Sequence, residues 1–219
     1  MTRNAVPREK ASILRGVMLT AAVKHQVTFT NWSQYTIGHN QLYDDWIRGG
    51  LCQGLSAKFL DCVRRGVDFL AEVNFDTLKI PGQYEKTPLQ NEIFHAAVVG
   101  NIRGKNWDQL GAFMEESYQL HPAEVVHFKT GTFRGPISRF SRYVTQGEYY
   151  YMMEFPGHAL AAVAHARGYF FFDPNCGIAY TNQKSAMRSF YSAFLGHSFT
   201  QGVYGHGHGF PINVQRLTG

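Results

Sequence analysis

The sequence predicts an α+β fold, with helices in the first half of the chain and an antiparallel sheet in the second. Apolar residues recur every three or four positions over residues 53–73, which is the period of a helix with one buried face. From residue 148 onward, short apolar and aromatic runs are separated by turns that contain Gly and Pro, a pattern typical of strands. The length of 219 residues suits a single domain with a full core.

Ahead of the long helix, the apolar run at residues 17–23 predicts a buried strand or helix. It is too short to span a membrane, and no small-residue cleavage site of a signal peptide follows it. Residues 26–30 alternate like a strand, and residues 31–35 have the composition of a loop. We assign residues 1–45 to an N-terminal segment or extension and residues 46–219 to the main domain, within a single domain overall.

Two further helices are predicted at residues 89–99 and 106–120 from their apolar spacing. The segment 130–136 contains two Gly and one Pro and is predicted as a loop beside the substrate cleft. Residues 149–155 predict the first clear strand of the sheet. Residues 184–195 predict a final helix with one apolar face.

Composition limits the classes of partner. The formal net charge is +5, and the basic residues are scattered along the chain. This pattern is typical of an ordinary solvated surface and is compatible with peripheral binding to an anionic membrane. No nucleic-acid-binding motif accompanies the charge.

The three cysteines lack the spacing of a disulfide framework, which predicts free thiols in a reducing compartment. We expect a monomer without a cofactor.

The most informative residue is Cys52, in the stretch Gly-Gly-Leu-Cys-Gln-Gly-Leu-Ser (49–56), where the long helical pattern begins. A cysteine in the first turn of a helix lies close to the positive end of the backbone dipoles and to unpaired amide hydrogens. Both favour the thiolate, which is the nucleophilic form. Free cysteines are more commonly buried as small hydrophobes, so Cys52 alone predicts little. Cys62 is expected to pack in the core, and Cys176 to lie unpaired near the site.

A predicted hairpin supplies two partners for this cysteine. His158 opens one strand, a tight turn follows at Arg167-Gly168, and Asp173 closes the second strand before Pro174. The apolar run 169–172 indicates that this second strand is covered on both faces. Because the start of one hairpin strand lies beside the end of the other, His158 and Asp173 are expected to be neighbours. A base oriented by a carboxylate is what an activated cysteine needs.

These segments resemble the YopT-type cysteine proteases, which are bacterial effectors and toxin domains that act in host cells. The resemblance rests on three motifs: Gly-x-Cys-x-x-Leu-Ser (50–56), Gly-His-Ala (157–159) and Phe-Phe-Asp-Pro-Asn-x-Gly (171–177). It extends from about residue 51 to residue 195. It implies a papain-like fold, in which the helix at Cys52 is central and the main domain is catalytic.

The resemblance also implies the roles of the site residues. Cys52 would be the nucleophile, His158 the general base and then acid, and Asp173 the residue that orients His158. Papain-like enzymes carry a Gln or Asn shortly before the nucleophile to hold the oxyanion, and Asn40 and Gln41 are the nearest candidates here. The substrates would be host signalling proteins such as small GTPases or kinases, reached after secretion from a bacterium into the host cytoplasm.

Several alternatives remain open. A glutamine or asparagine deamidase, or a transglutaminase, can use the same triad with an amide side chain as acyl donor. A non-enzymatic binding module is disfavoured because all three triad residues are present. His39 is a reserve candidate for the base, whereas His165 is expected at the opposite end and face of its strand. The motif His-Gly-His-Gly (206–209) lacks accompanying carboxylate or cysteine ligands, so we predict no metal site.

Overall fold

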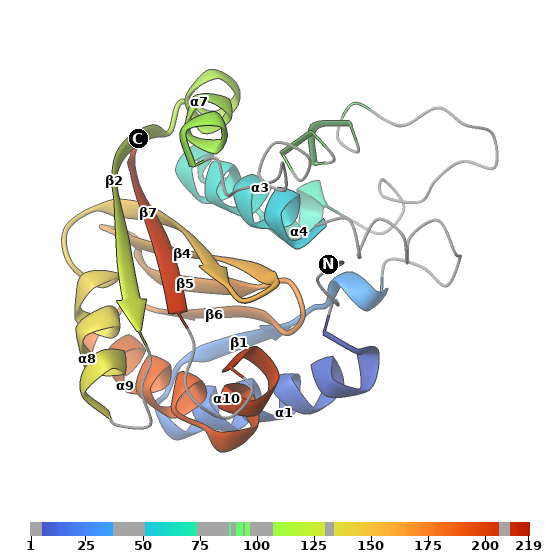
Figure 1. Ribbon diagram of the computed structural model, residues 1–219, viewed down its shortest axis with the longest axis vertical. Coiled ribbons are helices and arrows are strands. Elements are labelled where there is room, and N and C mark those ends of the chain that lie inside the picture. Colours follow the sequence, from blue (N-terminus) through green and yellow to red (C-terminus); the bar gives the residue numbers. More distant parts are fainter. Residues whose placement is uncertain are drawn as a thin grey trace.

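The computed structural model describes residues 6–36, 51–73, 88, 91–93, 95–96, 107–129, 134–205 and 211–219. Within these residues, one antiparallel sheet has the strand order β1-β6-β5-β4-β3-β7-β2 (Figure 1). Its strands are β1 (Thr28–Asn31), β2 (His121–Lys129), β3 (Tyr149–Phe155), β4 (His158–His165), β5 (Gly168–Asp173), β6 (Gly177–Thr181) and β7 (Pro211–Thr218).

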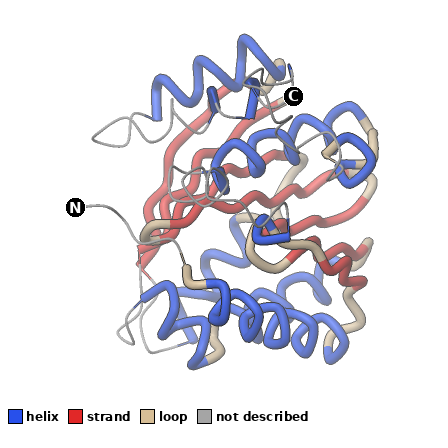
Figure 2. The backbone as a smooth tube through the Cα atoms, turned by 90° about the vertical axis from the view of Figure 1, so that its right-hand side faces the viewer, coloured by secondary structure: helices blue, strands red, loops and turns tan. Residues whose placement is uncertain are grey.

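Helices cover both faces of the sheet (Figures 1 and 2). On one face lie α3 (Leu51–Arg65), α4 (Phe69–Glu72) and α7 (Trp107–Tyr118). On the other face lie α1 (Arg8–Lys24), α8 (Arg134–Tyr143), α9 (Lys184–Leu195) and α10 (Ser198–Gly205). A short 3₁₀ turn, η1 (Gln34–Thr36), follows β1. The predicted α+β class is confirmed.

The central strand β4 shows why the sheet can be covered on both sides. Successive side chains of a strand point to opposite faces, and alternate residues of β4 belong to two separate apolar clusters. Ala159, Ala161 and Val163 pack toward α3, whereas the alternate residues pack on the side of α9. Because four residues of β4 are alanines, helix α3 can lie close to the sheet. The site helix is therefore fixed against the strand that begins at His158.

Several sequence predictions are confirmed in detail. The strand β3 and the helix α9 have the bounds that the sequence predicted. The hairpin β4–β5 has its turn between His165 and Gly168. Phe171 and Phe172 point into different apolar clusters, so the strand at 169–172 is covered on both faces as predicted.

The predicted helix over residues 53–73 was wrong in its second half. Helix α3 ends at Arg65, because Gly66 has a left-handed φ of 72° and reverses the chain. The amide of Val67 donates to the carbonyl of Cys62 (3.0 Å), which is a Schellman-type helix end. The side chain of Asp68 then accepts from the amide of Leu70 (2.9 Å) and caps the separate helix α4.

Two elements contradict the sequence predictions. The sheet was expected to begin at residue 148, but β2 already forms an edge strand, paired with β7. Its exposed residues and a register shift between Pro122 and Glu124 hide the alternation by which a strand is recognised. The predicted loop at 130–136 is helical from Arg134, where α8 begins, and residues 130–133 lie outside the described residues.

The N-terminal segment is packed into the same structure. Helix α1 contacts α9, α10 and β1, and β1 pairs with β6 at one edge of the sheet. The apolar run at 17–23 is helical, as one of the two expected forms, but it is only partly buried, because Leu19 and Val23 are exposed. The boundary drawn at residue 45 lies outside the described residues and stays a prediction.

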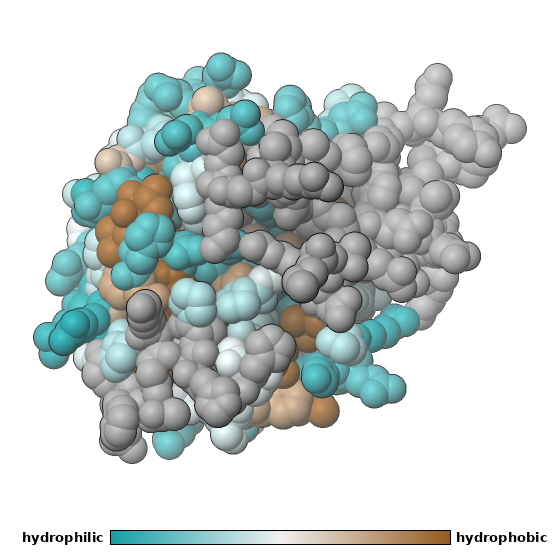
Figure 3. Space-filling model, in the orientation of Figure 1, coloured by the Kyte–Doolittle hydropathy of each residue, from teal (hydrophilic) through white to brown (hydrophobic). Residues whose placement is uncertain are grey.

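The described surface is chemically mixed. Hydrophilic residues are spread over the described part of the face in Figure 3, and apolar residues show between them in small patches. Among the helices that the structure describes, none combines the length and the apolar character needed to cross a bilayer.

Candidate active site

Cys52 is the second residue of α3, so the predicted helix start at this cysteine is confirmed. Its side chain is nearly buried, with the residue 8% exposed. The helix packs over β4, which begins at His158. The N-terminal end of a helix offers amide hydrogens that have no partner within the helix, together with the positive end of the helix dipole, and both favour a negative charge nearby.

The β4–β5 hairpin brings His158 and Asp173 together. Nε2 of His158 lies 2.8 Å from Oδ1 of Asp173, and both residues are buried. The strand register explains this contact, since Ala161 pairs with Phe172, and beyond that pair β5 ends at Asp173 and β4 begins at His158, at the same end of the hairpin. The distance is that of a charge-assisted hydrogen bond between imidazole and carboxylate. Because Asp173 occupies Nε2, the other ring nitrogen, Nδ1, is left for the sulfur of Cys52.

The electrostatics of the pair keep His158 protonated. Burial alone would lower the pKa of His158, but the charge of Asp173 and its hydrogen bond outweigh burial. The hydrogen bond and charge of Cys52 act in the same direction, so the pKa of His158 rises to about 10. Burial alone would likewise raise the pKa of Asp173, but His158 and two further donors hold it below its ordinary value. At neutral pH the site therefore holds an imidazolium beside a carboxylate.

The turn after Asp173 supplies part of this environment. The amide of Asn175 donates to Oδ1 of Asp173 (2.8 Å), and the amide of Cys176 donates to its backbone carbonyl (2.9 Å). Gly177 follows with a φ of 135°, and a Cβ there would collide with the carbonyl of Thr30. The motif Asp-Pro-Asn-x-Gly is thus a turn that fits against the end of β1 and points the carboxylate at His158.

Three residues of this site were missed by the sequence analysis. The hydroxyl of Tyr204, from α10, donates to Oδ2 of Asp173 (2.8 Å), and its ring stacks on the imidazole of His158. The side chain of Asn175 lies 3.2 Å from Nε2 of His158, and Gln34 donates to Asn175 Oδ1 (2.7 Å). Tyr204 and Gln34 are far from the triad in sequence. Asn175 lies in the motif Phe-Phe-Asp-Pro-Asn-x-Gly (171–177), two residues after Asp173, and its place in this turn is the signal that could have identified it.

The other cysteines differ from Cys52. Cys62 is fully buried in the core, as predicted, and burial raises the pKa of its thiol to about 12. Cys176 lies beside Asp173 without a disulfide partner, as predicted, and burial raises the pKa of its thiol well above the ordinary value. Both thiols therefore stay protonated and shielded at neutral pH.

His165 lies at the far end of β4 from His158, as expected. Its ring nitrogen Nδ1 accepts from the amide of Arg167 (3.2 Å), and the guanidinium of Arg167 donates to the carbonyl of Val63 near the C-terminal end of α3. Asn40, Gln41, His39, His206 and His208 lie outside the described residues. Within the described part of the chain, no group of three His, Cys, Asp or Glu side chains could hold a metal ion.

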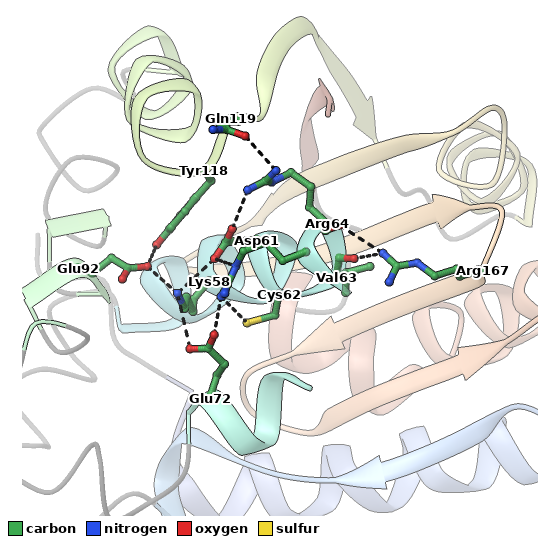
Figure 4. Close-up of polar contacts among 11 residues, drawn as sticks. Lys58, Asp61, Cys62, Val63, Arg64, Glu72, Glu92, Tyr118, Gln119 and Arg167 are labelled. Atoms are coloured by element: carbon green, nitrogen blue, oxygen red, sulfur yellow. Dashed lines mark hydrogen bonds and ion pairs between the residues drawn. The ribbon is translucent and has the colours of Figure 1, made fainter. Parts of the chain in front are cut away.

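A cluster of charges fixes the face of α3 that points away from the sheet (Figure 4). Nζ of Lys58 lies 3.2 Å from Asp61 and 3.0 Å from Glu92, and Arg65 contacts Asp61 (2.9 Å) and Glu72. The side chains of Lys58 and Asp61 are only 7% and 5% exposed. This cluster was not predicted, because charged residues on a helix usually face solvent. It ties α3 to α4 and to the segment at Glu92.

Replacing Lys58 by methionine is expected to destabilise the protein by about 3 kcal/mol, because Asp61 would remain buried with less compensation and Glu92 would lose its cation. Methionine keeps most of the apolar stem, so the charge is the main change. Urea unfolding measures the difference. The control is Lys24→Ala on the exposed end of α1, expected to change stability by less than about 0.5 kcal/mol. Equal effects of both changes would contradict the prediction.

Residues 144–216 match a family model, Peptidase_C58, described as Yersinia/Haemophilus virulence surface antigen. The matched segment contains His158 and Asp173 and the strands that carry them. The chain resembles the Peptidase_C58 family. On this match it is a cysteine protease, and the predicted resemblance is confirmed. Comparison with curated protein sequences gave no match.

Two solved structures share the fold. The Pseudomonas avirulence protein AvrPphB has a TM-score of 0.55 and 18% identity, over 80% of this chain and 95% of that one. PatoxP, a cysteine protease-like domain of the Photorhabdus asymbiotica toxin PaTox, has a TM-score of 0.55 and 14% identity. The latter match covers 96% of this chain and 59% of that one. The papain-like α+β fold predicted from the sequence is therefore confirmed.

Proposed function

We propose that the protein is a cysteine endopeptidase with Cys52 as nucleophile, His158 as general base and acid, and Asp173 as the residue that orients His158. The observation that carries this proposal is the 2.8 Å contact between His158 and Asp173, formed beside the N-terminal end of the helix that bears Cys52. The electrostatic influence of Cys52 on His158 supports it, because such influence requires the sulfur to lie close to the ring.

The chemistry follows from the protonation states. The thiolate of Cys52 attacks the scissile carbonyl carbon, and the resulting oxyanion accepts from the backbone amide of Cys52. The imidazolium of His158 gives its proton to the leaving amine, so the C–N bond breaks and an acyl-enzyme remains. His158, now neutral, takes a proton from water, which attacks the thioester. The peptide acid leaves and Cys52 is regenerated.

Asp173 and the oxyanion donors complete the proposed site. Asp173 remains ionised throughout, because its role is to hold the ring of His158 and to stabilise the imidazolium. Asn40 and Gln41 stay the proposed source of a second oxyanion donor. We predict no metal ion or cofactor for this reaction.

The proposed substrate is a signalling protein of a host cell, such as a small GTPase or a kinase, cleaved in the host cytoplasm after secretion from a bacterium. Similarity to an avirulence protein and to a toxin domain supports this class of target.

Host-cell extract treated with the wild-type protein or with Cys52→Ala tests the proposal by mass spectrometry of protein N-termini. New N-termini that depend on Cys52 would support an endopeptidase and identify its cleavage preference. Intact proteins with Gln-to-Glu or Asn-to-Asp changes would instead assign the site to a deamidase, and cross-linked products would assign it to a transglutaminase.

A further inference from the structure

Tyr204 meets both members of the orienting pair, although it lies on the last helix before β7. Its ring is nearly parallel to the imidazole of His158, with an interplanar angle of 4° and a centroid distance of 5.4 Å. Such offset stacking restricts the tilt of a ring. Tyr204 is 1% exposed, and the ring of Phe155 packs edge-on against it (5.3 Å). The stacking partner of His158 is therefore itself held in place.

The hydroxyl of Tyr204 is a fixed donor to the carboxylate. It lies 2.8 Å from Oδ2 of Asp173, the oxygen opposite the one that contacts His158. Burial and the charge of Asp173 raise the pKa of Tyr204 well above its ordinary value, so the hydroxyl keeps its proton. With both carboxylate oxygens engaged, Asp173 cannot rotate away from His158.

A chain of amides sets the direction of these hydrogen bonds. Nε2 of Gln34 donates to Oδ1 of Asn175 (2.7 Å), which leaves the Asn175 amino group facing Tyr204 and His158. An amino group can only donate, so the oxygen of Tyr204 accepts from it and directs its own proton to Asp173. For the same reason, the proton on Nε2 of His158 goes to Asp173 and not to Asn175.

We infer that Tyr204 is a positioning residue of the active site, which holds the His158 ring by stacking and the Asp173 carboxylate by a hydrogen bond. This inference rests on the proposed function of the triad. Among the described residues, the titratable groups that face His158 are Asp173 on β5, Cys52 on α3 and Tyr204 on α10, and Asp173 also meets the thiol of Cys176. Without Tyr204, the His158 ring and the Asp173 carboxylate would be less restrained. The imidazolium would then be positioned less well to stabilise the thiolate of Cys52.

The test is the pH dependence of Cys52 alkylation by iodoacetamide, followed by intact mass, in the wild type, Tyr204→Phe and Tyr204→Leu. Buried Cys62 and Cys176 stay protonated, so the reaction reports Cys52. In Tyr204→Phe the ring remains and the hydrogen-bond donor is lost. The pH below which the alkylation rate falls is expected to rise by about one unit. Tyr204→Leu loses both contacts and is expected to show a larger shift.

A second readout separates positioning from stability. On a peptide substrate that the wild type cleaves, Tyr204→Phe is expected to lower kcat about 10-fold and to leave KM unchanged. The control is Tyr191→Phe. Tyr191 is also a buried tyrosine but lies on α9, and this change should leave both alkylation and kcat unchanged. Unchanged alkylation and kcat in folded Tyr204→Phe would overturn the inference. Alkylation needs no peptide substrate, so it tests Tyr204 separately from the proposed proteolysis.

Discussion

Replacement of Cys52 by alanine is expected to lower kcat/KM by at least about 10⁴-fold, because the thiolate that forms the acyl-enzyme is lost. The fold should be retained. Cys52 lies in the first turn of α3, and its removal deletes one sulfur atom from a position at the edge of the core. A stability cost of about 1 kcal/mol is expected. Peptide cleavage and thermal unfolding of the same preparation measure the two effects.

Cys62→Ala is the matched control, since it makes the same chemical change ten residues further along the same helix. Cys62 is fully buried, so this variant is expected to lose more stability than Cys52→Ala while it keeps its activity per folded molecule. Cys176→Ala should also remain active. Full activity in Cys52→Ala would remove the basis of the proposed mechanism.

An element of the fold could be predicted when the residues that determine it lie within the element itself. Helix α9 and strand β3 have strong, uninterrupted patterns, and their bounds were predicted correctly. The end of α3 was missed because it depends on one backbone angle at Gly66, and the apolar spacing continues beyond it into α4. Strand β2 was missed because an edge strand with exposed side chains gains its stability from pairing with β7, which follows much later in the chain.

The site divides in the same way. His158 and Asp173 could be placed together because a hairpin converts sequence spacing into contact. Tyr204 and Gln34 could not, since α10 and η1 contact the pair through tertiary packing between segments that are far apart in the sequence. A hydrogen-bond donor to a buried carboxylate is required physically. The sequence nevertheless contains twelve tyrosines, and it does not indicate which one supplies it.

Asp173→Asn is expected to move the alkaline limit of activity to lower pH and to reduce kcat/KM at neutral pH by up to about 10⁴-fold. In the wild type, the carboxylate opposes the effect of burial and holds the pKa of His158 at about 10. The imidazolium should therefore persist until the pH rises through that value. Without the carboxylate, burial lowers the pKa of His158 and the proton is lost earlier. The pH profile of kcat/KM measures the shift.

The same pair makes stability depend on pH in a defined window. His158 has a folded pKa above its unfolded value of about 6.5, so its contribution is complete below that value and is lost as the pH rises through about 10. Asp173 has a lowered pKa, so its contribution is present above about 3.9 and is lost as the pH falls below it. The stability gap between wild type and Asp173→Asn should therefore be widest between about pH 4 and about pH 6.5, and it should shrink as the pH rises toward about 10.

Asp108→Asn is the control, because it makes the same substitution at an exposed position in the first turn of α7. It should leave both the alkaline limit of activity and the pH dependence of unfolding unchanged. If Asp173→Asn shared the alkaline limit of the wild type, Asp173 would not be the group that sets the protonation of His158. The proton of the imidazolium would then have to be held by Cys52 alone, as a simple dyad with the thiolate.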